Sequence, residues 1–277
     1  DSGALTRLDQ DRGAFRELGN VVSCRSVGRR ILQTPEPERP VVEWAMQQDV
    51  LSEIVAGRIW ASERPVWFAG VRLRARTSVI RLDDRKLLVH SPAPPSDGLV
   101  RQMAALGAVS WLIVPNCFHH LGTPAAAAAF PAAKILGPRS AAAKNPALRI
   151  DVDIHGTGFT EAVPEFALLP LKGVPFLDET LLYHRPTETL LGADVVLRAD
   201  ESDHWSWRLA ARITGCFKRL SVPPDVRKKV ADKEAAAGSL RALHALPIKR
   251  LIVAHGDVVT EAPLAQLVEA WRRIGVG

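Results

Sequence analysis

The chain has 277 residues, of which 47% are hydrophobic and 24% charged, and these ordinary values for a globular protein exclude wholesale disorder. No stretch approaches the roughly 20 uninterrupted apolar residues of a membrane-spanning helix, so no membrane partner is expected. The net charge of +6 favours anionic ligands, but it is weak evidence for nucleic-acid binding, because neither a helix-turn-helix pattern nor a strand of interleaved basic and aromatic residues accompanies it.

The first 57 residues are predicted to form an N-terminal extension ahead of a domain that spans residues 58–277. Residues 1–39 mix charges and glycine without a sustained period and lead into a proline-rich linker, which indicates an extension that is packed on the body or partly disordered. The segment 41–56 carries apolar residues at nearly helical spacing and predicts one short amphipathic helix.

Residues 59–90 have the composition of β-structure. Short β-prone runs follow one another and predict a meander of hairpins at 65–68, 71–75, 77–82 and 86–90. A helix is predicted over residues 98–106, where Ser96 or Asp97 can cap its start. Gly107 is expected to end it.

The apolar run Trp111 to Val114 is too short for a buried helix and too continuous for a half-exposed strand, so it predicts a central parallel strand. Pro115 ends the strand because it has no N–H to donate. His119 and His120 follow in a polar loop. Loops at the carboxyl ends of such strands collect reactive side chains, so we expect both imidazoles at the rim of the sheet.

Strands and helices alternate on both sides of this loop. The remaining strands are predicted at 133–136, 166–171, 180–184, 189–191 and 250–254. The remaining helices are predicted after Pro124 and at 138–144, 205–216, 224–245 and 262–274. This alternation is typical of an α/β fold in which helices cover sheets, and its recurrence in both halves indicates two similar halves packed sheet against sheet.

Several of these strands end in residues that bind metals. His90, the pair His119 and His120, Asp194 and His255 each follow an apolar β run, so they can meet at one edge of the sheets. Histidine and aspartate are ordinary ligands of zinc, iron or manganese in hydrolytic sites. Plainer interpretations stay open: loop histidines can bind loop carbonyls, and Asp194 can cap the segment that follows it.

The order of these pieces resembles the metallo-β-lactamase superfamily of metallo-hydrolases, and more closely a branch marked by a strand ending in Pro-Asn-x-x-His-His. The matching pieces are Leu87–Pro92, Pro115–Gly122, Leu191–Asp194 and Val253–Asp257. The resemblance covers roughly residues 59–277. It implies a four-layer αββα sandwich of two mixed β-sheets flanked by helices.

The superfamily's signature loop is His-x-His-x-Asp-His followed by x-Gly. When this signature is aligned with the chain from the C-terminal end of the loop, His120 corresponds to its last histidine and His119 to its aspartate. Cys117 and Pro115 fall on the first two histidines, and Val174 replaces the histidine of the later Gly-His-Thr. The first of the superfamily's two metal positions therefore lacks its ligands in this chain.

The second metal position keeps its ligands, because Asp194 corresponds to the aspartate that bridges the metals and His255 to the final histidine. The resemblance therefore implies a single zinc or iron ion, held by His119, His120, Asp194 and His255. A metal-bound water would be the nucleophile, and Asp194 and His120 would be the catalytic residues.

Three further residues are expected to support these ligands without touching the ion: His90, Cys117 and His184. For Cys117 the plainer interpretation is a small buried apolar residue. For His184, and for Glu179 on the strand that leads to Asp194, it is an ordinary polar partner.

The function favoured by the sequence is a metal-dependent hydrolase of a small, anionic substrate. The alternative is a catalytically inactive member of the same fold that binds a small anionic ligand or a protein partner. A third possibility, suggested by the positive net charge, is a nuclease. The cysteines Cys24, Cys117 and Cys216 are widely spaced and odd in number, which indicates a reducing, cytoplasmic setting. No secretory signal is expected from the first residues, although a leader removed ahead of Asp1 stays open.

Overall fold

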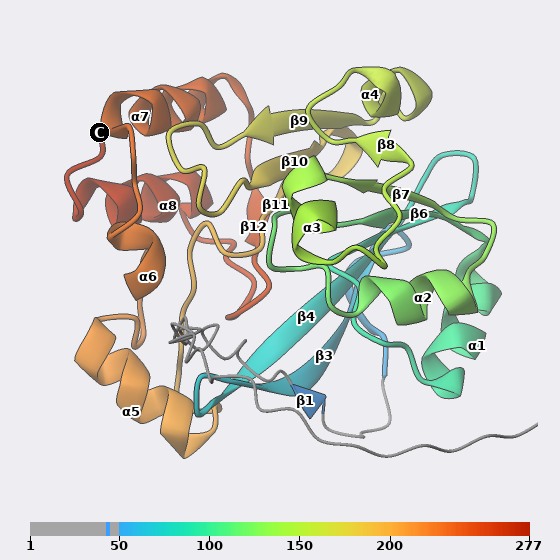
Figure 1. The fold of residues 1–277 in the computed structure, drawn as a ribbon, viewed down its shortest axis with the longest axis horizontal. Helices are drawn as coiled ribbons and strands as arrows, with labels where there is room; N and C mark the ends of the chain where they lie inside the picture. Colours follow the sequence, from blue (N-terminus) through green and yellow to red (C-terminus); the bar gives the residue numbers. More distant parts are fainter. Residues whose placement is uncertain (1–42, 45–49) are drawn as a thin grey trace, which may run out of the picture. The chain divides into compact units, whose positions relative to one another are not determined.

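The computed structural model describes residues 43–44 and 50–277 (Figure 1). The chain divides into two units, residues 1–39 and 40–277, and the first lies entirely outside the described residues. The predicted extension over residues 1–57 and the domain start at residue 58 therefore stay predictions.

The larger sheet has eight strands in the order β1-β3-β4-β5-β6-β7-β8, with β2 paired to β3. Their bounds are β1 (Glu43–Trp44), β2 (Ser52–Val55), β3 (Ile59–Phe68), β4 (Val71–Arg81), β5 (Leu87–His90), β6 (Val109–Ile113), β7 (Lys134–Gly137) and β8 (Val152–Asp153). Pairing is antiparallel up to β5 and parallel from β5 to β8. The central parallel strand predicted after residue 108 is confirmed, because β6 lies between β5 and β7.

The smaller sheet has four strands in the order β12-β11-β10-β9. These are β9 (Phe166–Pro170), β10 (Thr180–His184), β11 (Thr189–Leu191) and β12 (Arg250–Ile252). β11 and β12 are parallel neighbours, so the segments that follow them leave the sheet at the same edge. The other two pairings are antiparallel, and the sheet is mixed like the first.

The helices of the described residues include those that cover the outer face of each sheet (Figure 1). Their bounds are α1 (Asp97–Leu106), α2 (Thr123–Ala129), α3 (Arg139–Lys144), α4 (Gly158–Ala162), α5 (Trp205–Thr214), α6 (Pro224–Arg227), α7 (Lys233–Ala242) and α8 (Pro263–Arg272). One buried cluster joins α1, α2 and α3 to the larger sheet, and another joins α7 and α8 to the smaller one. The predicted four-layer αββα sandwich is therefore confirmed.

A third cluster fills the space between the two sheets. Along β6, Trp111 and Ile113 belong to this inner cluster, whereas Leu112 packs toward the helices. Successive side chains of a strand point to opposite faces, so a strand buried on both faces is apolar throughout. This is why the run at 111–114 shows no alternation.

Two predicted elements are wrong. The helix expected over residues 41–56 is replaced in the described part by β1 and β2, because β2 pairs antiparallel with β3 and this pairing overrides the local spacing. The predicted break at Arg76 does not occur. Its side chain is buried, donates to the Val253 carbonyl oxygen at 2.8 Å and pairs with Glu63, so β4 runs through it without interruption.

The helical region predicted over residues 224–245 is divided, because α6 ends at Arg227 and Asp232 starts α7 by accepting a hydrogen bond from the Ala235 N–H. Among the helices of the described residues, none has both the length and the apolar composition to cross a bilayer. Cys117 and Cys216 are free and buried, and Cys24 lies outside the described residues. A reducing setting stays a prediction.

Candidate metal centre

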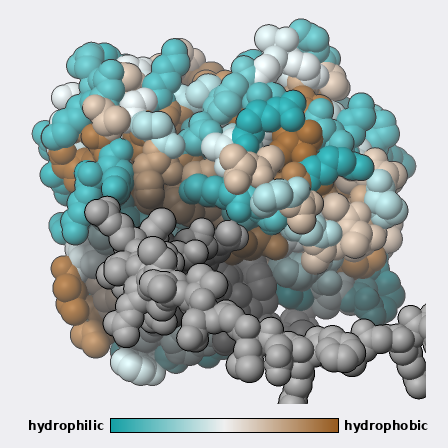
Figure 2. All heavy atoms as spheres, viewed as in Figure 1, coloured by the Kyte–Doolittle hydropathy of each residue, from teal (hydrophilic) through white to brown (hydrophobic). Residues whose placement is uncertain are grey.

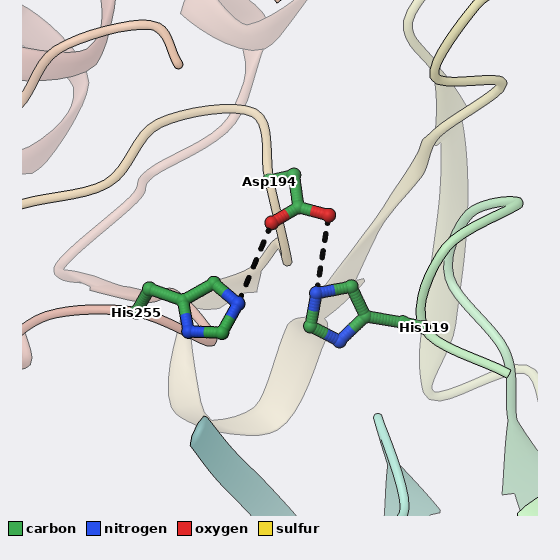
Figure 3. Close-up of side chains that lie close together, drawn as sticks. All are labelled: His119, Asp194 and His255. Carbon is green, nitrogen blue, oxygen red and sulfur yellow. Dashed lines mark ion pairs between the residues drawn. The ribbon is translucent and has the colours of Figure 1, made fainter. Parts of the chain in front are cut away.

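Three residues from three separate loops meet at one edge of the sandwich (Figure 3). His119 follows β6, Asp194 follows β11 and His255 follows β12, and their ligand atoms lie within 4.8 Å of one another. His119 Nε2 is 3.1 Å from Asp194 Oδ2, and His255 Nε2 is 3.6 Å from Asp194 Oδ1. One carboxylate therefore faces two imidazoles, with one oxygen for each.

The outer nitrogen of one ring is held by β4 of the larger sheet, and that of the other by the residue that follows β5. His255 Nδ1 lies 2.7 Å from the carbonyl oxygen of Arg74, which can only accept, so Nδ1 carries a proton. His119 Nδ1 lies 2.6 Å from Ser91 Oγ, a hydroxyl that is able to accept. Ser91 adopts a left-handed φ of 53°, which side chains other than glycine rarely do. When both Nδ1 atoms carry the proton, both Nε2 lone pairs are available to a cation beside Asp194, whereas a protonated His119 donates its Nε2–H to Asp194 instead.

The charges of the group follow from burial and from Asp194. Burial lowers the pKa of His119, but the charge of Asp194 and its hydrogen bond outweigh this effect, so the pKa is raised overall. For His255 the effect of burial exceeds the opposing effect of the Asp194 charge, so the pKa of His255 is lowered. Burial opposes ionisation of Asp194, yet the facing imidazoles outweigh it and lower the pKa of that carboxyl. Asp194 is therefore ionised at neutral pH.

A hydrogen-bonded pair beneath the group connects the loop of His119 to that of Asp194. Asn116 Oδ1 accepts the backbone N–H groups of Phe118 and His119 at 2.8 and 2.9 Å. Its Nδ2 donates to Glu179 Oε2 at 3.1 Å and to Asp194 Oδ2 at 3.0 Å. One amide side chain thus shapes the histidine loop and fixes the carboxylate that faces it.

Glu179 holds the other side of this connection. It is buried, and it accepts the backbone N–H of Ala193 at 2.7 Å and that of Asp194 at 2.9 Å. Burial and the charge of Asp194 raise the pKa of Glu179 to about 7. From the sequence, Glu179 is interpreted as an ordinary polar partner and Asn116 is not singled out. The signal available there was the Asn of the Pro-Asn-x-x-His-His loop.

His120 is not a member of the three-residue group. Its backbone oxygen accepts from the Thr123 N–H at 3.1 Å, and its buried Nδ1 has no hydrogen-bond partner among the described residues. Burial lowers its pKa, with further contributions from Lys144 and His119. Its expected role as a fourth ligand stays a prediction without support from this geometry.

The three expected supporting residues lie in different places. His90 ends β5 directly before Ser91, fully buried, and burial followed by the charge of His119 lowers its pKa to about 3. Cys117 Sγ donates to the Phe176 carbonyl oxygen at 3.2 Å, and burial raises its pKa, so it stays a thiol. His184 is at the opposite end of β10 from Glu179 and contacts Thr187, away from Asp194.

The donor set fits a divalent cation. Two imidazole nitrogens and one carboxylate form the set that holds non-haem iron, and zinc also accepts it when further positions stay open. The side chains of His119, Asp194 and His255 are 13%, 17% and 11% exposed, so solvent or a small substrate still reaches the group.

Comparison with solved structures identifies the fold. Three similar structures are metallo-β-lactamases. One is from Pontibacter korlensis (12% identity, 81% of this chain, 99% of that one, TM-score 0.56), and one is FIM-1 from Pseudomonas aeruginosa in its mono-zinc form (9%, 83%, 98%, 0.57). The third is from Erythrobacter litoralis with beta mercaptoethanol in its active site (12%, 83%, 100%, 0.60). This chain has the metallo-β-lactamase fold.

Sequence comparisons add less. The family model described as a domain of unknown function, DUF4336, matches residues 56–141, which include the histidine loop but neither Asp194 nor His255. No curated protein matches the chain. The fold is therefore shown, and the chemistry must be argued from the residues at the edge of the sandwich.

Proposed function

We propose that the chain is a metal-dependent hydrolase that holds one zinc or iron ion at His119, Asp194 and His255. The observation that carries this proposal is the orientation of the ligands. Asp194 turns one oxygen to each imidazole, and Ser91 and the Arg74 carbonyl group hold the far nitrogens of the rings. Partners of this kind fix the tautomer and direction of metal-binding histidines.

A bound zinc or iron ion would acidify a coordinated water and polarise a substrate oxygen, which is what hydrolysis at neutral pH requires. The protein's own contribution is to keep the ligands ready. Glu179 and Asn116 fix the ionised Asp194 in place, and burial favours the neutral form of His255, whose lone pair is then free. The ligand atoms need little rearrangement to accept an ion.

A small anionic ester, amide or phosphoester is the substrate class that we propose. Lys144 is exposed, and its Nζ lies 2.9 Å from Cys117 Sγ and 3.7 Å from the centre of the Phe118 ring, in the same loop as His119. Arg74, on the other side of the group, is already paired with Asp203, Asp200 and Asp257. Lys144 is therefore the cation best able to attract a negative group.

Metal analysis of protein purified without chelator tests the proposal. We expect close to one equivalent of zinc or iron in the wild type and its loss in Asp194→Asn and His255→Ala. His244→Ala is the matched control, because His244 is an exposed histidine in the short helical turn that follows α7. His120→Ala decides the fourth ligand: retention of the ion would remove His120 from the ligand set.

The rival is an inactive protein of the same fold, and one observation favours it. Without an ion, a protonated His119 pairs with Asp194 at 3.1 Å, so the carboxylate already has a partner for its charge. Folded wild-type protein that contains no metal, takes up none on addition of zinc or iron(II), and hydrolyses none of a panel of chromogenic anionic esters and phosphodiesters would establish this rival. Metal uptake coupled to hydrolysis, both lost in Asp194→Asn, would exclude it.

A further inference from the structure

An exposed row of apolar side chains runs along α5. Trp205, Leu209 and Ile213 are 64%, 54% and 79% exposed. The row continues onto the β3–β4 hairpin, because the ring of Trp67 lies 5.7 Å from that of His204, which in turn lies 5.6 Å from Trp205. We call Trp67, Trp205, Leu209 and Ile213 the apolar ridge. In Figure 2, hydrophobic side chains reach the surface at the lower left, where Figure 1 places α5.

The apolar ridge is not needed to hold α5 on the fold. The opposite face of the helix carries Trp207 and Ala211, which are buried in a cluster with Leu197 and Cys216. The backbone N–H of Arg72 also donates to Ser206 Oγ at 3.1 Å and ties the helix to β4. Helix α5 is thus anchored on one side and presents large apolar side chains to solvent on the other, an arrangement that marks an interaction surface.

The shape of the ridge suits a flat partner. Residues at positions i, i+4 and i+8 of a helix lie on one face, so the three α5 side chains form a straight row about 12 Å long. A single helix that projects such a row is convex, so it presents no groove to an extended peptide. Tryptophan, which carries a polar N–H group on an apolar ring, prefers the boundary between apolar and aqueous phases.

The chain around the ridge has a net positive charge. Residues 200–230 carry seven Lys and Arg residues against four acids, of which Asp200 and Asp203 are paired with Arg74. Arg212, Lys218 and Arg219 are exposed, and Glu201 is the acid that pairs with the first two. A second copy of the chain would bring the same positive charges against these, so the charge disfavours a dimer through this surface and favours a negative one.

We propose that the apolar ridge and its basic surroundings dock the protein on the surface of an anionic lipid bilayer. The apolar side chains enter the interface while arginine and lysine face the phosphate groups of the lipids. No membrane partner is expected from the sequence, in which no apolar stretch is long enough to span a bilayer, but docking on the surface needs only one amphipathic helix. The inference is independent of the metal centre.

Cosedimentation of the full chain with vesicles tests this proposal. We expect the protein to pellet with phosphatidylcholine vesicles that contain phosphatidylglycerol, and to stay in solution with phosphatidylcholine alone. Added salt is expected to release it. The double variant L209S/I213S should lose vesicle binding, and each loss of charge in Arg212→Gln or Arg219→Gln should weaken the partition about five-fold.

Controls separate docking from damage to the fold. Val50→Ser removes an exposed apolar side chain outside the ridge, and Arg101→Gln removes an exposed charge on α1. Both should bind as the wild type does, and all variants should keep the wild-type circular dichroism and melting temperature. The proposal is overturned if the wild type stays in solution with anionic vesicles, or if L209S/I213S binds them as tightly as the wild type does. It is also overturned if the wild type forms a dimer without lipid and L209S/I213S abolishes that dimer.

Discussion

Asn116 and Glu179 are 63 residues apart in the sequence and are joined by a hydrogen bond of 3.1 Å beneath the candidate metal centre. Asn116 belongs to the loop after β6 in the larger sheet, and Glu179 directly precedes β10 in the smaller one. The bond therefore crosses between the two sheets where His119 and Asp194 approach each other. The geometry of the metal centre depends on this connection.

The substitution Asn116→Asp should damage the centre more than its size suggests. The new carboxylate keeps both acceptor bonds to the backbone of Phe118 and His119, but it replaces the amide donor with an oxygen that faces Glu179 and Asp194. We expect the free energy of unfolding to fall by about 2 kcal/mol, because buried acceptors lose their donor and negative charges meet. Urea unfolding measures this. A variant as stable as the wild type would show that this hydrogen-bonded connection does not stabilise the fold.

The substitution Glu179→Gln should weaken the same connection from its other end. The oxygens of Glu179 accept three N–H groups, from Asn116, Ala193 and Asp194, and an amide would turn a donor toward at least one of them. We expect a loss of about 1–3 kcal/mol in stability and a lower metal content. Glu161→Gln, on an exposed position of α4, is the control and should change neither. Equal effects in both variants would refute the assigned role.

The sequence predicted most of the architecture because its strands are short apolar runs bounded by clear stops. The run Trp111 to Val114 is the best example: burial on both faces leaves it without a polar residue, and Pro115 ends the run. The topology of α/β folds also predicts that the carboxyl ends of neighbouring parallel strands lie at the same edge of a sheet. This is why His119, His120, Asp194 and His255 could be expected near one edge before their positions were known, and three of these four lie together.

The remaining features depended on contacts between distant residues. Arg76 was interpreted as a break because arginine is usually exposed, yet the Val253 carbonyl group, 177 residues away, accepts from it. The role of Glu179 also depends on distant residues, because its hydrogen-bond partners lie in two other loops. His120 was expected in the group because it corresponds to the last histidine of the signature loop, and the group that the structure brings together contains His119 instead. Such distinctions need coordinates.

The acid stability of the protein should depend on His184. Burial lowers its pKa to about 4, Arg58 adds repulsion and Asp83 opposes it, and Glu165 Oε2 lies 3.5 Å from its Nε2. The folded pKa lies below the ordinary value of 6.5, so between these values the unfolded chain binds a proton that the folded protein does not. The stabilising contribution is therefore complete above pH 6.5 and is lost as the pH falls toward about 4.

His184→Asn removes this titration and should flatten the pH dependence. The difference in unfolding free energy between wild type and variant should shrink by up to about 3 kcal/mol from neutral pH to about pH 4. Urea unfolding of both proteins across this range provides the measurement. His155→Asn, at a partly exposed histidine, is the control and should leave the pH dependence of the wild type in place. A constant difference at all pH values would contradict the buried, neutral state of His184.

Gly122, which ends the histidine loop, should tolerate no side chain. Its backbone lies so close to the β5–α1 connection that a Cβ atom would sit 2.3 Å from the Pro92 carbonyl oxygen and 2.6 Å from Ala93 Cα. Both contacts are backbone, so the loop itself must shift, and overpacking of this kind costs about 1–3 kcal/mol. Because Ser91, which holds His119, directly precedes Pro92, Gly122→Ala should also reduce metal content.

Gly158→Ala is the matched control for this last change. Gly158 opens α4, and its nearest neighbour outside the helix would be 4.0 Å from a Cβ atom, which is ordinary contact. Alanine there should leave stability unchanged or raise it by a few tenths of a kcal/mol, since it restricts the unfolded chain. Urea midpoints and metal content for the two variants distinguish a steric requirement at Gly122 from a general effect of replacing glycine. If both variants behave alike, the close approach of the loop to Pro92 does not hold the centre together.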